Sequence, residues 1–268
     1  MIKAMYACPG YGEPFERRLA AVAEAGFDEI ALDFEKELEP TETAWENQLS
    51  LAEQYHLPVE QVHLTGDGMN GIWKDYAWGD ELCRRTLAEI GRMSSLGLSL
   101  GVIHVTWGLA RPEREPNETG LRRFAAIAEE AEKKGVYVAL ENSVFSDYVA
   151  YLLGHIDSTH IGLCYDSGHK NAFTPDFDYL SRFGTRLFTT HLHDNNGKRD
   201  EHRIPYDGSI DFDALAKQFA AIPVTRQKIT LECAASTDEP LEAFARRAHD
   251  AAIRLENQIA ACETEKNK

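Results

Sequence analysis

The sequence lacks paired cysteines, long apolar runs and an excess of basic residues, and each absence excludes a class of protein. Its five cysteines are scattered and form no CxxC pair, so no disulfide framework is predicted. No stretch reaches the roughly 20 consecutive apolar residues of a membrane-spanning helix, and the N-terminus lacks the apolar core of a signal peptide. We therefore expect a soluble, cytoplasmic protein with no membrane contact.

Basic residues are too few and too dispersed to indicate a nucleic-acid surface. The chain holds 28 Lys and Arg against 44 Asp and Glu, for a formal net charge of −16. Because nucleic-acid binding usually requires a basic patch, this balance weighs against DNA or RNA as a partner. Low-complexity runs and long Pro-, Gly- or Ser-rich linkers are absent as well. With 268 residues, 43% of them hydrophobic, the chain is predicted to form one large domain.

Short apolar segments alternate with helical ones along the whole chain. This alternation predicts parallel strands joined by right-handed crossovers, and eight such units in roughly 250 residues are typical of a (β/α)8 TIM barrel. An open, doubly wound sheet would carry a glycine-rich fingerprint, and Pro9-Gly10-Tyr11-Gly12 is not GxGxxG. We expect one α/β domain over residues 1–268, with the barrel at about 2–257 and a short C-terminal tail at 258–268. The predicted strands cover residues 2–8, 29–33, 59–64, 100–105, 136–140, 161–165, 187–191 and 228–231.

The densest group of metal-ligand side chains lies in the thirteen residues from Thr190 to His202, which include three histidines and two aspartates. The apolar run that precedes them is typical of a buried strand, which would deliver its last side chains to the strand end. Imidazole and carboxylate groups at such a position suit a divalent cation such as Zn²⁺ or Mn²⁺. The alternative is a polar loop in which the histidines have no common role.

The same residue types end most of the other predicted strands. In a barrel all carboxyl ends of strands face one rim, where active sites lie. A carboxylate in an apolar strand is costly if it is buried without a partner, and a shared cation would satisfy several at once. We therefore predict a metal site built around Glu141, Asp166, His191 and Glu232. The full set of strand-end residues is His63, His104, Glu141, Asp166, His191 and Glu232, with His169 three residues after Asp166.

Taken one at a time, these residues also have ordinary explanations. His63 and His104 could be hydrogen-bonded core histidines, and Asp200 and His202 could be solvated loop residues. Glu141 could cap a helix, and Glu232 could pair with an arginine.

Three further side chains are interpreted as substrate contacts. Trp107 follows the fourth predicted strand and could present an apolar wall to a sugar ring, or simply pack its loop against the barrel. Trp73 and Trp78 allow the same two interpretations. Lys198 and Arg199 could bind a phosphate or an oxyanion, or lie in a solvated loop.

Five short segments, taken in order, resemble the xylose isomerase-like TIM-barrel superfamily. The resemblance covers about residues 2–257. This superfamily includes sugar and sugar-phosphate isomerases and epimerases, inosose dehydratases and isomerases, and the endonuclease IV type of DNA repair enzyme. The segments are Leu140-Glu141-Asn142-Ser143, Asp166-Ser167-Gly168-His169, His191-Leu192-His193-Asp194, Asp200-Glu201-His202 and Leu231-Glu232.

The epimerase-type members imply one divalent metal (Mn, Zn, Mg or Co) on the four predicted ligands, with His169 touching a substrate oxygen. They imply that Glu141 and Glu232 are catalytic and remove and return a proton next to a carbonyl, through an enediolate. The expected function is thus that of a sugar or polyol isomerase or epimerase in carbohydrate metabolism, with dehydration of an inosose as a close variant. The Arg that some ketose epimerases place six residues past the metal His falls at Gly197 here. By resemblance, a homo-oligomer is also expected.

The endonuclease IV type implies a different site, a three-zinc cluster that also uses His63, His104, His169, Asp200 and His202. All these positions hold ligand-type residues. The chain nevertheless departs from the repair enzymes: His193-Asp194-Asn195-Asn196 stands where they have Asn-Asp-Ser-Lys, and Tyr206-Asp207-Gly208 replaces Gly-Glu-Gly. One metal is therefore favoured over three. A non-catalytic ligand-binding barrel is the third alternative, and the residues do not choose the substrate or its phosphorylation.

Overall fold

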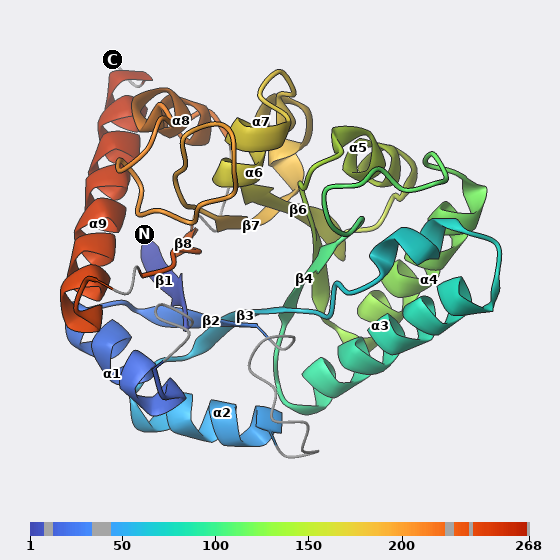
Figure 1. The fold of residues 1–268 in the computed structure, drawn as a ribbon, viewed down its shortest axis with the longest axis horizontal. Coiled ribbons are helices and arrows are strands. Elements are labelled where there is room, and N and C mark those ends of the chain that lie inside the picture. The colour runs from blue at the N-terminus through green and yellow to red at the C-terminus, as the bar shows by residue number, and fades with distance from the viewer. Residues whose placement is uncertain (8–12, 34–43, 223–227, 236–237, 267–268) are drawn as a thin grey trace.

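Eight parallel strands follow one another around a barrel in the computed structural model, which describes residues 1–7, 13–33, 44–222, 228–235 and 238–266 (Figure 1). Seven neighbouring pairs form regular parallel ladders, in the order β7-β6-β5-β4-β3-β2-β1-β8. The last gap, between β7 and β8, is bridged just past β7, where the Leu192 amide donates to the Thr230 carbonyl at 2.9 Å. The predicted (β/α)8 barrel is confirmed. The strands are β1 (Ile2–Tyr6), β2 (Glu29–Asp33), β3 (Val59–His63), β4 (Leu100–His104), β5 (Tyr137–Glu141), β6 (Ile161–Asp166), β7 (Leu187–His191) and β8 (Lys228–Leu231).

The helices surround the strands and begin and end where local chemistry dictates (Figure 1). The Asn117 side chain accepts hydrogen bonds from the amides of Thr119 and Gly120 and so caps the first turn of α4. Gly135, at φ 68°, ends the same helix in the left-handed conformation that glycine adopts without strain. The α-helices are α1 (Phe15–Ala25), α2 (Ala44–Gln54), α3 (Ala77–Ser95), α4 (Glu118–Lys134), α5 (Ser146–His155), α6 (Ser167–Phe173), α7 (Tyr179–Phe183), α8 (Phe212–Phe219) and α9 (Leu241–Lys266), with 3-10 turns η1 (Met69–Trp73) and η2 (Gly184–Arg186).

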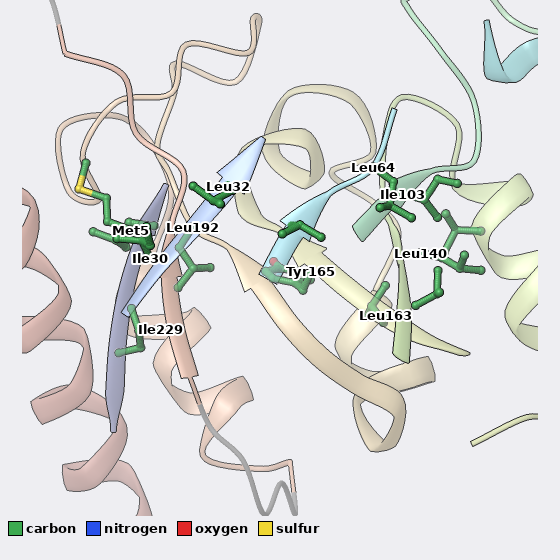
Figure 2. Close-up of a cluster of buried hydrophobic side chains, with 14 of the residues drawn as sticks. Met5, Ile30, Leu32, Leu64, Ile103, Leu140, Leu163, Tyr165, Leu192 and Ile229 are labelled. Carbon is green, nitrogen blue, oxygen red and sulfur yellow. The ribbon is translucent and has the colours of Figure 1, made fainter. Parts of the chain in front are cut away.

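The main hydrophobic core lies between the strands and the helices. Figure 2 shows its strand side, where residues such as Ile103, Leu140 and Leu163 are completely buried. Because side chains alternate between the two faces of a strand, the residues one position further along point into the barrel. His104 and Glu141 are two of these, and they are the last residues of β4 and β5. Strand periodicity therefore turns the polar strand ends inward, toward one another.

The C-terminal segment differs from the prediction of a short tail after residue 257. Helix α9 continues to Lys266 and packs against α1 and α8. Its apolar stripe runs through Ala252, Leu255 and Ile259, all at most 1% exposed, at the spacing of one helix face. Only Ile259 of this stripe lies beyond residue 257, so the sequence pattern is weak in the last part of the helix. Cys8, the end of the first predicted strand, lies outside the described residues.

Helix α6 was not anticipated. It begins directly after Asp166, whose carboxylate accepts a hydrogen bond from the His169 amide at 2.6 Å. Helix α7 is capped by the Asp178 side chain, which accepts a hydrogen bond from the Ser181 amide. Within the described ranges, no helix combines the length and the apolar character needed to cross a membrane.

Candidate metal centre

The carboxyl ends of the strands surround one polar cavity, as the sequence predicts. Acidic side chains and histidines from β2, β3, β4, β5 and the segments after β6, β7 and β8 all contribute to its wall. Trp107 adds an aromatic surface. The residues that line the cavity are Asp33, His63, His104, Trp107, Glu141, His169, Asp200, His202 and Glu232.

Glu141 lies at the centre of this arrangement and faces four imidazoles. Its Oε2 atom is 3.1 Å from His63 Nε2 and 3.0 Å from His104 Nε2. Its Oε1 atom is 3.1 Å from His169 Nδ1 and 3.4 Å from His191 Nδ1. Burial opposes ionisation of the carboxyl, but the imidazoles, His104 foremost, hold the pKa of Glu141 well below its usual range. Glu141 is therefore a buried anion even without a metal.

His191 presents a nitrogen to two carboxylates. Its Nδ1 atom is 3.2 Å from Glu232 Oε2 and, as noted, 3.4 Å from Glu141. The residue is completely buried, and Nδ1 forms no hydrogen bond within the described part of the chain. Asp166, also completely buried, completes a group of four whose ligand atoms all lie within 4.8 Å of one another. A buried nitrogen without a partner, next to three carboxylates, fits a divalent cation, since the cation would satisfy all of them.

A second group lies on the loop after β7. His202 Nε2 is 3.0 Å from Asp200 Oδ2, and His193 Nε2 is 3.5 Å from Asp200 Oδ1. The rings of His193 and His202 are stacked with their centroids 4.2 Å apart. The resemblance to the endonuclease IV type named His169, Asp200 and His202 among the further metal ligands, and did not include His193. In the structure His193 joins this group, whereas His169 bridges it to the centre, 3.3 Å from Asp200 and 3.1 Å from Glu141.

A third group is formed by His63, His104 and Glu141, whose ligand atoms also lie within 4.8 Å of one another. The structure thus brings together all nine residues that the sequence offered as metal ligands. Two of the three groups share Glu141, and His169 connects Glu141 to Asp200 of the third group.

The model of the xylose isomerase-like TIM barrel family matches residues 19–254. The chain belongs to this family. A curated protein of Sinorhizobium fredii, "Uncharacterized protein y4fM", is 32% identical over an alignment of 187 residues, and the match covers 64% of this chain and 59% of that protein. The chain therefore spans less than two thirds of the length of this relative.

Several solved structures have the same barrel fold as this chain. A fusion of a xylose isomerase-like TIM barrel with 4-hydroxyphenylpyruvate dioxygenase matches all of this chain and 44% of its own, with a TM-score of 0.77 at 16% identity. A D-tagatose 3-epimerase-like protein matches over 100% of both chains, with a TM-score of 0.74 at 19% identity. The IOLI protein, which holds a zinc atom, matches over 97% of this chain and 99% of its own, with a TM-score of 0.73 at 16% identity. These likenesses establish the fold.

The ring nitrogens of this xylose isomerase-like barrel show where a cation would replace a proton. His63 Nδ1 lies 2.8 Å from the Leu64 carbonyl, which can only accept, so Nδ1 carries a hydrogen. Its Nε2 atom faces the Glu141 carboxylate, so it must carry a second hydrogen in the metal-free protein. His202 has the same pattern, with the Glu232 carbonyl 2.8 Å from Nδ1 and Asp200 near Nε2. A metal-bound histidine usually donates the hydrogen of its other ring nitrogen to an acceptor such as a backbone carbonyl, which is the arrangement of both Nδ1 atoms here.

The metal-free protein should lose stability as the pH rises from 6.5 to about 9. Burial lowers the pKa of His202, but its hydrogen bond to Asp200 outweighs this and raises the pKa to about 9. The pKa values of His63, His169 and His191 are raised as well. A histidine with a raised pKa stabilises the folded state. This stabilisation is complete at pH values below 6.5, the ordinary pKa of histidine, and is lost as the pH rises through the folded-state pKa. For His202 alone the loss amounts to about 3 kcal/mol.

Urea denaturation of the chelator-treated protein across this pH range measures the effect. The His202→Gln variant is the control, because it should reduce the slope. Glu141 and Glu232 set the acidic limit: their lowered pKa values stabilise the fold above 4.5, and this contribution is lost as the pH falls. A free energy of unfolding that stays constant from pH 6.5 to 9 would contradict the prediction.

The side chains that the sequence offered as substrate contacts lie in three different environments: the cavity wall, the exposed surface and the core. Trp107 lines the cavity, with its ring centroid 5.7 Å from that of His104, and the Asn70 side chain holds the Trp107 backbone through two hydrogen bonds of 2.8 Å. Lys198 and Arg199 are exposed and lie outside the cavity wall. Trp73 is buried at 1% exposure and donates to the Val105 carbonyl, so its ring belongs to the core.

Two residues of the site were not predicted. Asp33 ends β2 and lines the cavity beside His63. It carries the same signal as the other ligands, a carboxylate at a strand end, and could have been found by it. Asn142 holds the ends of β5 and β6 together, because its side chain donates to the Asp166 carbonyl and accepts from the Asp166 amide. Only the paired strands reveal that role.

Proposed function

We propose that this protein is a divalent-metal-dependent isomerase or epimerase of a small sugar or polyol, acting by proton transfer next to a carbonyl. One observation carries the proposal: the carboxylates of Glu141 and Glu232, which line the cavity, both face the unpartnered Nδ1 of the buried His191. A group of this kind can hold one metal ion together with Asp166. The likeness to a D-tagatose 3-epimerase-like protein and to the zinc-holding IOLI protein supports it.

The proposed ligands of the ion are Glu141, Asp166, His191 and Glu232. When bound, the ion supplies a Lewis acid for a carbonyl oxygen. Glu141 and Glu232 both border the cavity, and each can take or return a proton at a substrate carbon placed between them. The carboxylates and imidazoles around them can bind hydroxyl groups, His169 among them, and the Trp107 ring can cover an apolar sugar face. A cytoplasmic location, homo-oligomerisation and substrate contacts from Lys198 and Arg199 stay predictions.

Solvent hydrogen exchange tests the proposal directly. The protein loaded with Mn²⁺, Zn²⁺, Mg²⁺ or Co²⁺ is incubated in D2O with ketopentoses, ketohexoses and an inosose, and deuterium next to the carbonyl is followed by NMR. We expect exchange together with epimer, isomer or dehydration product, and its loss on chelation. Binding of these compounds without exchange by any loaded form would indicate a ligand-binding barrel instead.

A second candidate is metal-assisted hydrolysis of abasic DNA, and the three ligand groups favour it. They are His63 with His104 and Glu141, the four proposed ligands, and His193 with Asp200 and His202. The formal net charge of −16 disfavours a DNA substrate. Elemental analysis and a nicking assay on an abasic duplex separate the two functions. One metal per chain without nicking excludes the repair activity, whereas three metals with nicking would replace our proposal.

A further inference from the structure

Tyr6 contacts the predicted metal ligand His191 from the end of β1. The Tyr6 hydroxyl oxygen is 3.0 Å from His191 Nε2, and the two rings meet edge to face at 88° with centroids 5.0 Å apart. Tyr6 is 1% exposed and His191 is completely buried, so water does not compete for this hydrogen bond. The contact joins residues that are 185 positions apart in the chain.

The hydrogen on Nε2 decides what the opposite nitrogen can do. A neutral imidazole carries one hydrogen, so Nδ1 offers a lone pair only if Nε2 holds that hydrogen. His191 Nδ1 is the atom that faces Glu141 and Glu232. In the protonated, metal-free imidazole, Nε2 also carries a hydrogen. The phenol oxygen of Tyr6 can accept from Nε2 in both states, so exchanging the Nδ1 proton for a metal ion requires no rearrangement on this side of the ring.

We propose that Tyr6 is a positioning residue of the metal centre, which keeps the Nε2 hydrogen of His191 in place and thereby presents Nδ1 to the ion. The inference rests on the metal-dependent function proposed above. A phenol is suited to this position because it accepts a hydrogen bond without adding another negative charge beside the buried Glu141 and Glu232. Removing a partner that orients a ligating histidine typically weakens metal binding by about 10- to 100-fold.

Zn²⁺ affinity of the Tyr6→Phe variant tests the inference. The substitution removes only the hydroxyl group, and competition with a chromophoric chelator should show Zn²⁺ binding that is about 10- to 100-fold weaker. Tyr165→Phe is the matched control. Tyr165 is also buried, at 5% exposure on β6, but its ring packs against Phe219 and does not line the cavity, so Zn²⁺ affinity should be unchanged.

The tautomer of His191 gives a readout that a merely structural role would not move. Long-range ¹H–¹⁵N NMR on the wild-type Zn²⁺ complex should show His191 with hydrogen on Nε2, and this measurement needs no variant. Metal-free Tyr6→Phe at alkaline pH should gain a population with hydrogen on Nδ1. Hydrogen on Nδ1 in the wild-type complex, or wild-type Zn²⁺ affinity in Tyr6→Phe, would overturn the role of Tyr6 and leave the proposed metal-dependent function intact. Wild-type protein that binds no Zn²⁺ would overturn it together with the proposed metal-dependent function.

Discussion

Replacing Glu141 with glutamine should slow proton exchange at the substrate carbon by about 10³-fold or more while the barrel stays folded. The variant loses a proposed base and a proposed metal ligand in one change. The fold should tolerate it because the facing imidazoles of His63, His104, His169 and His191 can release protons once the negative charge is gone. No uncompensated buried charge then remains. We expect Glu232→Gln to lower exchange to a similar extent, since its carboxylate forms the other side of the proposed pair.

Glu60→Gln provides a matched control for these variants. Glu60 lies on β3 and is also a buried glutamate, at 6% exposure. It accepts hydrogen bonds from the hydroxyls of Thr189 and Thr230. Burial raises the pKa of Glu60, the opposite direction from Glu141 and Glu232. An amide oxygen can accept one of the same hydrogen bonds, and exchange should stay within about threefold of wild type. Deuterium incorporation and bound metal are measured on all three variants. Full exchange by folded Glu141→Gln or Glu232→Gln would show that another group moves the proton.

Replacing Asp194 with alanine should lower the free energy of unfolding by about 3 to 5 kcal/mol. The Asp194 side chain is completely buried, and its two oxygens accept four backbone hydrogen bonds of 2.8–3.1 Å. Without the carboxylate, these four donors lose their acceptor inside the protein. The segment that they hold returns to the barrel after Asp200 and His202, so the cavity should lose both side chains as well. The four donors are the amides of Asn195, Tyr206, Gly208 and Ile210.

The Asp211→Ala variant is the matched control for Asp194→Ala. Asp211 also accepts a backbone hydrogen bond, from the Ala214 amide at 2.9 Å, but it is exposed and serves as an ordinary helix cap. Its replacement should cost about 1 kcal/mol. Urea denaturation of both variants measures the difference. Equal losses of stability would show that water replaces the Asp194 carboxylate easily. Gly208 belongs to the same arrangement, because a Cβ atom there would lie 2.3 Å from Asp194 Oδ1.

Most of the fold and the central residues of the candidate site could be predicted from local patterns. Glu141 follows the apolar run of β5, and Asp166 and Glu232 follow those of β6 and β8. Alternation along a strand turns such residues inward, and barrel topology brings strand ends to one rim. Asp33 obeys the same rule, since it is the last residue of β2. The C-terminal end of α9 was placed too early, because only Ile259 of its buried apolar stripe lies beyond residue 257.

The sequence by itself therefore determined the barrel and the rim on which its acids and histidines lie, because both follow from short-range periodicity and strand order. The tertiary structure alone decided the pairings. It placed four imidazoles around Glu141, put His193 with Asp200 and His202, and set Tyr6 behind His191. It also left Lys198 exposed, although only one residue separates it from Asp200. These contacts depend on the direction of each side chain across the barrel, between residues up to 185 positions apart, and no local pattern encodes that direction.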